Sequence, residues 1–288
     1  MAPILSILSR VNDVTSRRTF LHSLLLGAGA ATLGARVYAR QTPSPARERP
    51  KKGLAGAAPI ASGLTTAWYY DWGVHPVSKG MAERDSSMRF VPMIWGLDGH
   101  TQSALDALRN RKLPVLFGFN EPDHHDQSNL TVEQALDAWP KFAGIANDLV
   151  APSCAQPHQS WMQRFVEGAG NRGLHFDSIG FHHYGSANPH DFIGLLTHVH
   201  DMYRKPIWVT EFGCVDWQAH GGRRNRYTEC DAIRFIETVC PFMERAEWVR
   251  GYAWYPWGKA GAGGPLPVSA FFQPDGTLTD AGLAYAAV

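Results

Sequence analysis

Short hydrophobic runs alternate with longer stretches of helical periodicity from about residue 65 to the end of the chain. Seven runs have the length and the Val, Ile, Leu and Phe content of buried strands. Strands that alternate with helices indicate parallel βα units, and repetition over this length predicts a (β/α)8 barrel. The seven are Thr65–Asp71, Arg89–Trp95, Pro114–Glu121, Leu149–Cys154, Ser178–Tyr184, Pro206–Phe212 and Arg250–Trp257.

Five segments between these strands have the spacing of amphipathic helices. Thr131 with Gln134 predicts a capping box at the start of one of them, and Pro140 and Pro241 predict bends. The missing eighth strand leaves a degenerate βα unit, which we expect between Trp72 and Arg89. The five segments are Thr101–Arg111, Thr131–Asn147, Ser160–Ala169, Pro189–Arg204 and Tyr227–Glu247.

A glutamate closes each of two hydrophobic strands. If the strand that ends at Glu121 is the fourth of the barrel, the strand that carries Glu211 is the seventh. Those two strands face one another across the barrel mouth, where the active sites of such barrels lie. A carboxylate pair of this kind is typical of retaining glycoside hydrolases, with one acid/base and one nucleophile. We expect hydrogen-bond donors around the nucleophile and a raised pKa for the acid. The alternative is a structural ion pair at each position.

Other polar and aromatic residues gather near the same strand ends. Alternation along the fifth predicted strand places His182 and Tyr184 on one face, where Tyr184 can donate to Glu211. A buried structural histidine is the alternative for His182. Indole rings suit the faces of sugars, so four tryptophans are candidate substrate-binding residues, although at least one is expected in the core. They are Trp72, Trp95, Trp254 and Trp257; Trp161 and Trp217 are candidates for outer subsites.

Neither histidine pair predicts a metal site. Adjacent histidines on a strand point to opposite faces, which argues against His182–His183. The same argument applies to His124–His125 unless a turn intervenes. Asp123 is expected to cap a loop. No metal or organic cofactor is therefore expected.

The N-terminus has the pattern of an export signal. Ser16-Arg17-Arg18-Thr19-Phe20-Leu21 matches the twin-arginine motif, and a short apolar stretch follows it. The pattern predicts a signal peptide over residues 1–39 that engages the twin-arginine translocation machinery, with no stable membrane anchor. The alternative is an uncleaved amphipathic helix. Residues 40–62, rich in Pro, Ala and charge, are expected to be a disordered linker. Residues 63–288 then form the folded domain, in the periplasm or outside the cell.

Charge and cysteine content exclude further classes. The net charge of +1 gives no basic excess for nucleic-acid binding. Cys154, Cys214, Cys230 and Cys240 form no Cys-x-x-Cys pair, so a zinc site is not expected. Cys230 and Cys240 lie too far apart on one predicted helix to pair with each other. Other pairings stay open, and a monomer is expected.

An ordered set of motifs resembles glycoside hydrolase family 128, the glycosyl hydrolase catalytic core group related to fungal alkali-sensitive-linkage proteins. The resemblance runs from about residue 65 to 280. It implies retaining endo-hydrolysis of β-1,3-glucan, with Glu121 as acid/base, Glu211 as nucleophile and Asn120 bonded to the sugar 2-hydroxyl. The motifs are Val91-Pro92-Met93-Ile94-Trp95, Gly118-Phe119-Asn120-Glu121-Pro122-Asp123, Gly180-Phe181-His182-His183-Tyr184, Thr210-Glu211-Phe212-Gly213 and Trp254-Tyr255-Pro256-Trp257.

Two alternatives remain at this point. The same carboxylate pair also serves retaining hydrolysis of other β-linked polysaccharides, because nothing in the residues fixes the linkage. A non-catalytic carbohydrate-binding barrel is the alternative from another class of protein.

Overall fold

The computed structural model describes residues 51–56, 63–76, 88–219, 222–256 and 264–288, and these hold eight parallel strands. The strands are β1 (Lys52–Ala55), β2 (Trp68–Tyr70), β3 (Arg89–Phe90), β4 (Leu113–Phe117), β5 (Ala146–Val150), β6 (Ile179–Gly185), β7 (Ile207–Cys214) and β8 (Val249–Trp254).

The strands close into a barrel, as the alternating pattern predicted. Six of them pair in the order β3-β2-β1-β8-β7-β6, and β4 pairs with β5. Three parallel bridges connect these groups, Met93 with Phe117, Val150 with Ser178 and Cys154 with Phe181. The strands ending at Glu121 and carrying Glu211 are therefore the fourth and the seventh, as expected.

The position of the first strand corrects two expectations. β1 lies inside the segment predicted to be a disordered linker, so the folded domain begins before residue 63. It is also the eighth strand that the pattern lacked. Within the predicted gap between Trp72 and Arg89, residues 77–87 lie outside the described part of the chain.

Two lysines explain how such a polar segment is built into the barrel. Lys52 is fully buried, and its Nζ donates to the carbonyl oxygens of Tyr285 at 2.8 Å and Val288 at 3.0 Å. Lys51 Nζ donates to the carbonyls of Glu244 at 3.0 Å and Ala246 at 2.9 Å. Each lysine thus satisfies carbonyl groups at the C-terminal end of a helix, where positive charge is also favoured.

Aromatic side chains fill the inside of the barrel. Trp68 packs edge-on against Trp208 at 5.1 Å between ring centroids and against Phe117 at 5.7 Å. Gly53 and Gly251 make room for these rings, because a Cβ at Gly53 would lie 2.3 Å from Trp68, and one at Gly251 would lie 2.4 Å from Trp208. A second, larger hydrophobic layer lies between the strands and the helices.

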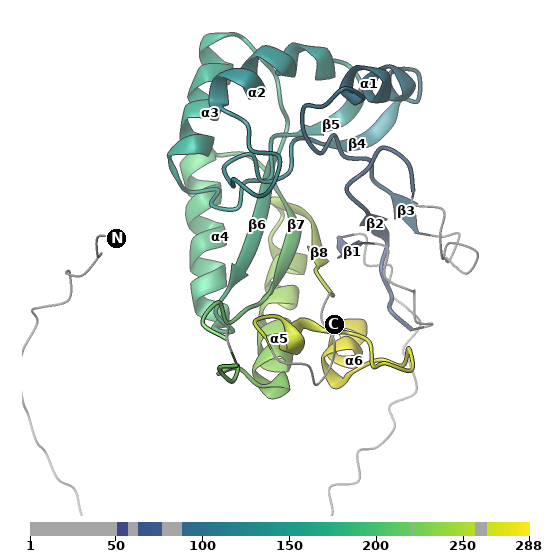
Figure 1. The fold of residues 1–288 in the computed structure, drawn as a ribbon, viewed down its shortest axis with the longest axis vertical. Coiled ribbons are helices and arrows are strands. Elements are labelled where there is room, and N and C mark those ends of the chain that lie inside the picture. The colour runs from purple at the N-terminus through teal and green to yellow at the C-terminus, as the bar shows by residue number, and fades with distance from the viewer. Residues whose placement is uncertain (1–50, 57–62, 77–87, 220–221, 257–263) are drawn as a thin grey trace, which may run out of the picture. The chain divides into compact units, whose positions relative to one another are not determined.

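Six α-helices are described, and Figure 1 shows α3 and α4 alongside β6. The predicted capping box of Thr131 and Gln134 is confirmed. Pro140 does more than bend its helix: α2 ends at Ala138, a 3₁₀ turn follows, and β5 begins at Ala146. Pro241, by contrast, lies within a continuous α5. The helices are α1 (Thr101–Arg109), α2 (Val132–Ala138), α3 (Ser160–Asn171), α4 (Pro189–Tyr203), α5 (Glu229–Arg245) and α6 (Asp280–Ala287).

All four cysteines are free thiols. Cys154, Cys214 and Cys240 are buried, and Cys230 is exposed on the same helix as Cys240. Among the described helices, none combines the length and the hydrophobicity that crossing a bilayer requires.

Candidate active site

The two predicted glutamates come together at the carboxyl ends of the strands. Glu121 follows β4, Glu211 lies on β7, and His182 on β6 stands between them. One carboxylate oxygen of each glutamate and one ring nitrogen of His182 all lie within 4.8 Å of one another. All three side chains are buried. A separation near 5 Å between carboxyl groups is that of retaining glycosidases, and inverting enzymes need a wider gap.

Glu211 is surrounded by hydrogen-bond donors, as expected for a carboxylate that must stay ionised. Tyr70 Oη donates to Oε1 at 2.5 Å, and Trp72 Nε1 donates to the same oxygen at 2.8 Å. The hydroxyl of Tyr184 donates to Oε2, which confirms the contact predicted from strand alternation. Burial and the charge of Glu211 raise the pKa of both tyrosines, so they stay protonated as donors.

The electrostatics of Glu121 differ from the expectation. Burial works to raise the pKa of its carboxyl group, but the hydrogen bond and the charge of His182 outweigh burial and lower that pKa. His182 Nδ1 lies 2.8 Å from Glu121 Oε1, and Nε2 lies 3.5 Å from Glu211 Oε1.

The same contacts act on His182 in the opposite direction. Burial works to lower its pKa, but the charge of Glu211 and the contact with Glu121 raise it. The expected rise in the pKa of Glu121 is therefore wrong, because the histidine between the two carboxylates favours the ionised form of Glu121. His183 points the other way, against Phe192, and burial lowers its pKa to about 4.

The backbone at Glu121 adopts an unusual conformation. Its φ is +38°, in the left-handed region that residues other than glycine seldom occupy. Two hydrogen bonds hold it there: Glu121 N–H donates to the carbonyl of Ser153 at 2.7 Å, and His124 N–H donates to that of Glu121 at 3.0 Å. Trp72, a donor to Glu211, also has a positive φ, of +59°. Strain of this kind is concentrated at functional sites.

Asn120, the residue that precedes Glu121, has an unused acceptor. The residue is 3% exposed, and its Nδ2 donates to Gln127 Oε1 at 3.2 Å. Its Oδ1 is buried without a hydrogen-bond partner among the described residues. A buried, unsatisfied oxygen is costly, so its retention here suits an acceptor reserved for a ligand hydroxyl.

The candidate tryptophans divide into three groups. Trp95 and Trp217 are exposed, at 41% and 56%, and Trp217 lies next to the site because its Nε1 donates to the carbonyl of Tyr184. Trp72 lies within the site as a donor to Glu211. Trp257 lies outside the described residues.

Two tryptophan expectations are wrong. Trp254 is fully buried and stacks on Phe271 at 5.2 Å, so it faces the helix layer and not the cleft. Trp161, the outer-subsite candidate, lies in α3, where its ring stacks on Phe165 at 5.7 Å and its Nε1 donates to the carbonyl of Leu130 at 2.8 Å, so it packs against the protein in place of lining a subsite.

Two tyrosines at the site were missed. Tyr70 lies two residues before Trp72, so strand alternation was the available signal. Tyr255 packs edge-on against Trp72 and Tyr184, and the charges of both glutamates add to burial in raising its pKa. It was overlooked beside the tryptophans of its motif.

The cluster of two glutamates and one histidine at the centre of the site also has the composition of a metal site. Glu121, His182 and Glu211 offer two carboxylates and one imidazole, a set that binds divalent transition metals elsewhere. Sequence spacing could not predict this cluster, because its members come from three strands that lie far apart in the sequence. An ion held there would occupy both carboxylates, and glycoside hydrolysis needs both of them free.

Comparisons with known proteins agree with this geometry. The family model described as "Glycosyl hydrolase catalytic core" matches residues 54–285. Alkali-sensitive linkage protein 1 of Schizosaccharomyces pombe is 26% identical over 209 residues, which is 68% of this chain and 36% of that protein. The chain thus spans about a third of this curated relative.

Solved structures show the same fold. A GH128 (subgroup I) endo-β-1,3-glucanase from Amycolatopsis mediterranei, in complex with laminaritriose, is 28% identical with a TM-score of 0.66, over 82% of this chain and 98% of that one. Variants of that enzyme with a glutamate replaced were solved with laminaripentaose and laminarihexaose. A GH128 (subgroup VII) oligosaccharide-binding protein from Cryptococcus neoformans is 25% identical with a TM-score of 0.63, over 82% and 92%.

Proposed function

The chain belongs to the glycosyl hydrolase catalytic core family, and on that premise we propose that it is a retaining endo-β-1,3-glucanase. Glu211 is the nucleophile and Glu121 the acid/base. The observation that carries the proposal is the carboxylate pair, with an oxygen of each within 4.8 Å across the mouth of a barrel and three donors on Glu211. The linkage rests on the resemblance to the endo-β-1,3-glucanases.

The first step forms a covalent glycosyl-enzyme. Glu211 attacks the anomeric carbon, and the bond from that carbon to the leaving oxygen breaks as Glu121 delivers a proton to the oxygen. Three donors hydrogen-bond the carboxylate oxygens of Glu211, and these bonds weaken as the negative charge of the carboxylate is lost to the new bond. Water, deprotonated by Glu121, then attacks the same carbon and frees Glu211 with net retention.

His182 stores a proton for these two reaction steps. In the free site its contact with both carboxylates favours the imidazolium and an ionised Glu121. Their hydrogen bond of 2.8 Å is a direct path for the proton to move to Glu121 as it is donated to the leaving group. The unsatisfied Oδ1 of Asn120 is positioned to accept from a substrate hydroxyl.

The proposal is tested by offering laminarin, curdlan, mixed-linkage glucan, cellulose and mannan to the full-length protein and measuring reducing ends, product lengths and the anomer first released. We expect activity on the β-1,3 polymers alone, oligosaccharide products and a β-anomer. Glu121→Gln and Glu211→Gln should each remove it. Activity on another polymer would keep the mechanism and overturn the linkage.

A second candidate, an oligosaccharide-binding barrel, is favoured by the similarity to a subgroup VII protein of that description. The paired glutamates and the donors on Glu211 favour the hydrolase, because binding alone requires no ionised nucleophile. A folded protein that binds laminari-oligosaccharides and leaves all five polymers intact would make this second candidate the better one.

Export by the twin-arginine route remains a proposal from the sequence, because residues 1–39 lie outside the described part of the chain. Its test is replacement of Arg17 and Arg18 together by lysine, which should retain the protein inside a bacterial host. Secretion that persists in the double variant would contradict it.

A further inference from the structure

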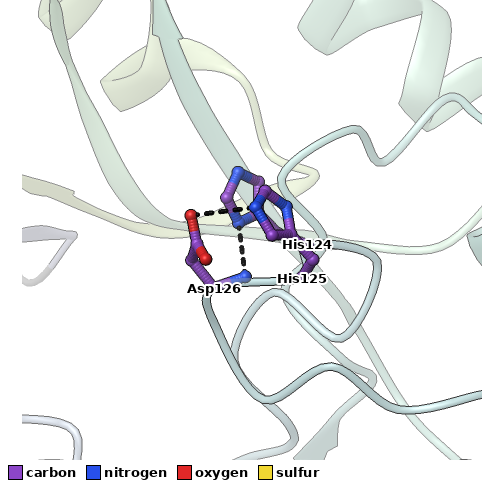
Figure 2. Close-up of side chains that lie close together, drawn as sticks. All are labelled: His124, His125 and Asp126. Atoms are coloured by element: carbon purple, nitrogen blue, oxygen red, sulfur yellow. Dashed lines mark hydrogen bonds and ion pairs between the residues drawn. The ribbon is translucent and has the colours of Figure 1, made fainter.

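The residues that follow Glu121 form a compact turn in place of an extended segment. His124 and His125 would point in opposite directions on a strand, which was the objection to a metal pair. Here a turn runs through both residues, and their rings stack with centroids 4.9 Å apart and planes 24° apart (Figure 2). Because a turn intervenes, the objection to a metal pair at His124 and His125 does not apply.

Asp126 completes the cluster. Its carboxylate lies 3.1 Å from His125 Nε2, and its backbone N–H donates to His124 Nδ1 at 3.2 Å (Figure 2). One ring nitrogen of each histidine and one carboxylate oxygen lie within 4.8 Å of one another. The side chains of His125 and Asp126 are 79% and 70% exposed, so water can complete the coordination of an ion.

The backbone of the turn that carries the three ligands is fixed at its base by hydrogen bonds. Both carboxylate oxygens of Asp123 accept backbone N–H groups, those of Ala155 and Gln156, each at 2.8 Å. This confirms the loop-capping role expected for Asp123. Leu130 N–H donates to the carbonyl of Pro122 at 3.0 Å across the turn.

We propose that His124, His125 and Asp126 form a binding site for one divalent late first-row transition-metal ion of the Zn²⁺ type. Two imidazoles and a carboxylate match the preferences of Zn²⁺, Ni²⁺ and Cu²⁺, and they suit the oxygen-seeking Mg²⁺ and Ca²⁺ poorly. The site lies outside the catalytic carboxylate pair and adds a ligand class that glycoside hydrolysis does not use.

The catalytic cluster of Glu121, His182 and Glu211 is a competing site, so the experiment removes it first. Zn²⁺ binding is measured by isothermal calorimetry on the full chain carrying Glu211→Gln. We expect one equivalent of Zn²⁺ to bind, with no detectable heat from Mg²⁺ or Ca²⁺. His125→Asn in the same background should weaken binding at least about tenfold, because loss of even an outer-sphere partner costs that much.

His175→Asn provides a matched control. His175 is 75% exposed and pairs with Asp177 at 2.8 Å, so it reproduces the exposed histidine–carboxylate pair without the second histidine. It should leave Zn²⁺ binding unchanged. Equal losses in the two histidine variants, or no binding by the Glu211→Gln chain when the unaltered chain binds, would overturn the proposal. The second outcome would place the ion at the catalytic cluster.

Discussion

Glu211 shows at the scale of single residues how side chains from separate parts of the chain satisfy one buried carboxylate. Three donors from two strands and a strand end converge on one carboxylate, and each is itself kept protonated or is an indole that cannot ionise. No single donor satisfies the carboxylate of Glu211 by itself. Losing one donor should therefore weaken catalysis and leave it measurable.

Tyr184→Phe is expected to lower kcat by roughly 100–1,000-fold, as removal of one preorganised donor typically does. Tyr203→Phe, which removes a hydroxyl bonded to the carbonyl of Pro157 outside the site, is the control. An unchanged kcat in the Tyr184 variant would contradict a role for this donor.

His182→Asn tests where the proton is held. In the unaltered protein the raised pKa of His182 retains the proton above pH 6.5, so the basic limb of kcat/KM should lie above that value. In the variant only Glu121 can hold the proton, and a carboxyl group releases it at lower pH than the imidazolium does. The basic limb should therefore move to lower pH. A limb that stays in place would exclude His182 as the proton store.

At the scale of elements, β1 demonstrates how a strand can depend on distant helix ends. Its polar start, Lys51 and Lys52, contacts α5 and the C-terminal end of α6, which lie about 190 and 230 residues further along the chain. The burial of Lys52 makes these bonds more consequential than those of the half-buried Lys51.

Lys52→Met should lower the free energy of unfolding by at least about 2 kcal/mol, because it leaves buried carbonyl groups without a hydrogen-bond donor. Lys51→Met, which removes a similar set of bonds at a more exposed position, should cost less. Urea denaturation followed by circular dichroism measures both. Equal losses in the two variants would show that burial of Lys52 adds nothing.

At the scale of the whole molecule, closure of the barrel joins the two ends of the fold. β1 pairs with both β2 and β8. The strand that the sequence pattern placed in a linker therefore completes the ring. Trp68 inside the barrel and Lys51 at its edge are joined by an indole N–H to carbonyl bond of 2.9 Å. An incomplete ring would leave unpaired backbone N–H and C=O groups along the free edges of β2 and β8.

Truncation tests this closure directly. A chain that begins at residue 49 should melt cooperatively at a temperature close to that of the full chain, because it retains β1. A chain that begins at Gly63 should lose cooperative melting and aggregate, because β2 and β8 are left without a partner. Thermal unfolding and size-exclusion chromatography distinguish the two. If the chain that begins at Gly63 were soluble and unfolded cooperatively, the domain boundary predicted at residue 63 would be correct.

Short-range pattern alone determined a large part of this protein. Hydrophobic runs located seven strands, and allowing for one missing early strand made those that end at Glu121 and carry Glu211 the fourth and the seventh. Strand alternation gave the shared face of His182 and Tyr184, and the capping box needed only residues three positions apart. These features depend on period and neighbours, which are visible in a linear chain.

Tertiary structure decided whatever depends on partners remote in sequence. β1 became a strand because Lys52 finds helix carbonyls more than 230 residues away, which no local pattern contains. His182, between two carboxylates from other strands, reversed the expected pKa shift of Glu121. Packing of the helix layer took Trp254 away from the cleft, and a pinned turn brought His124 and His125 together. The physical reason is common to all four: burial, charge and contact are properties of three-dimensional neighbours.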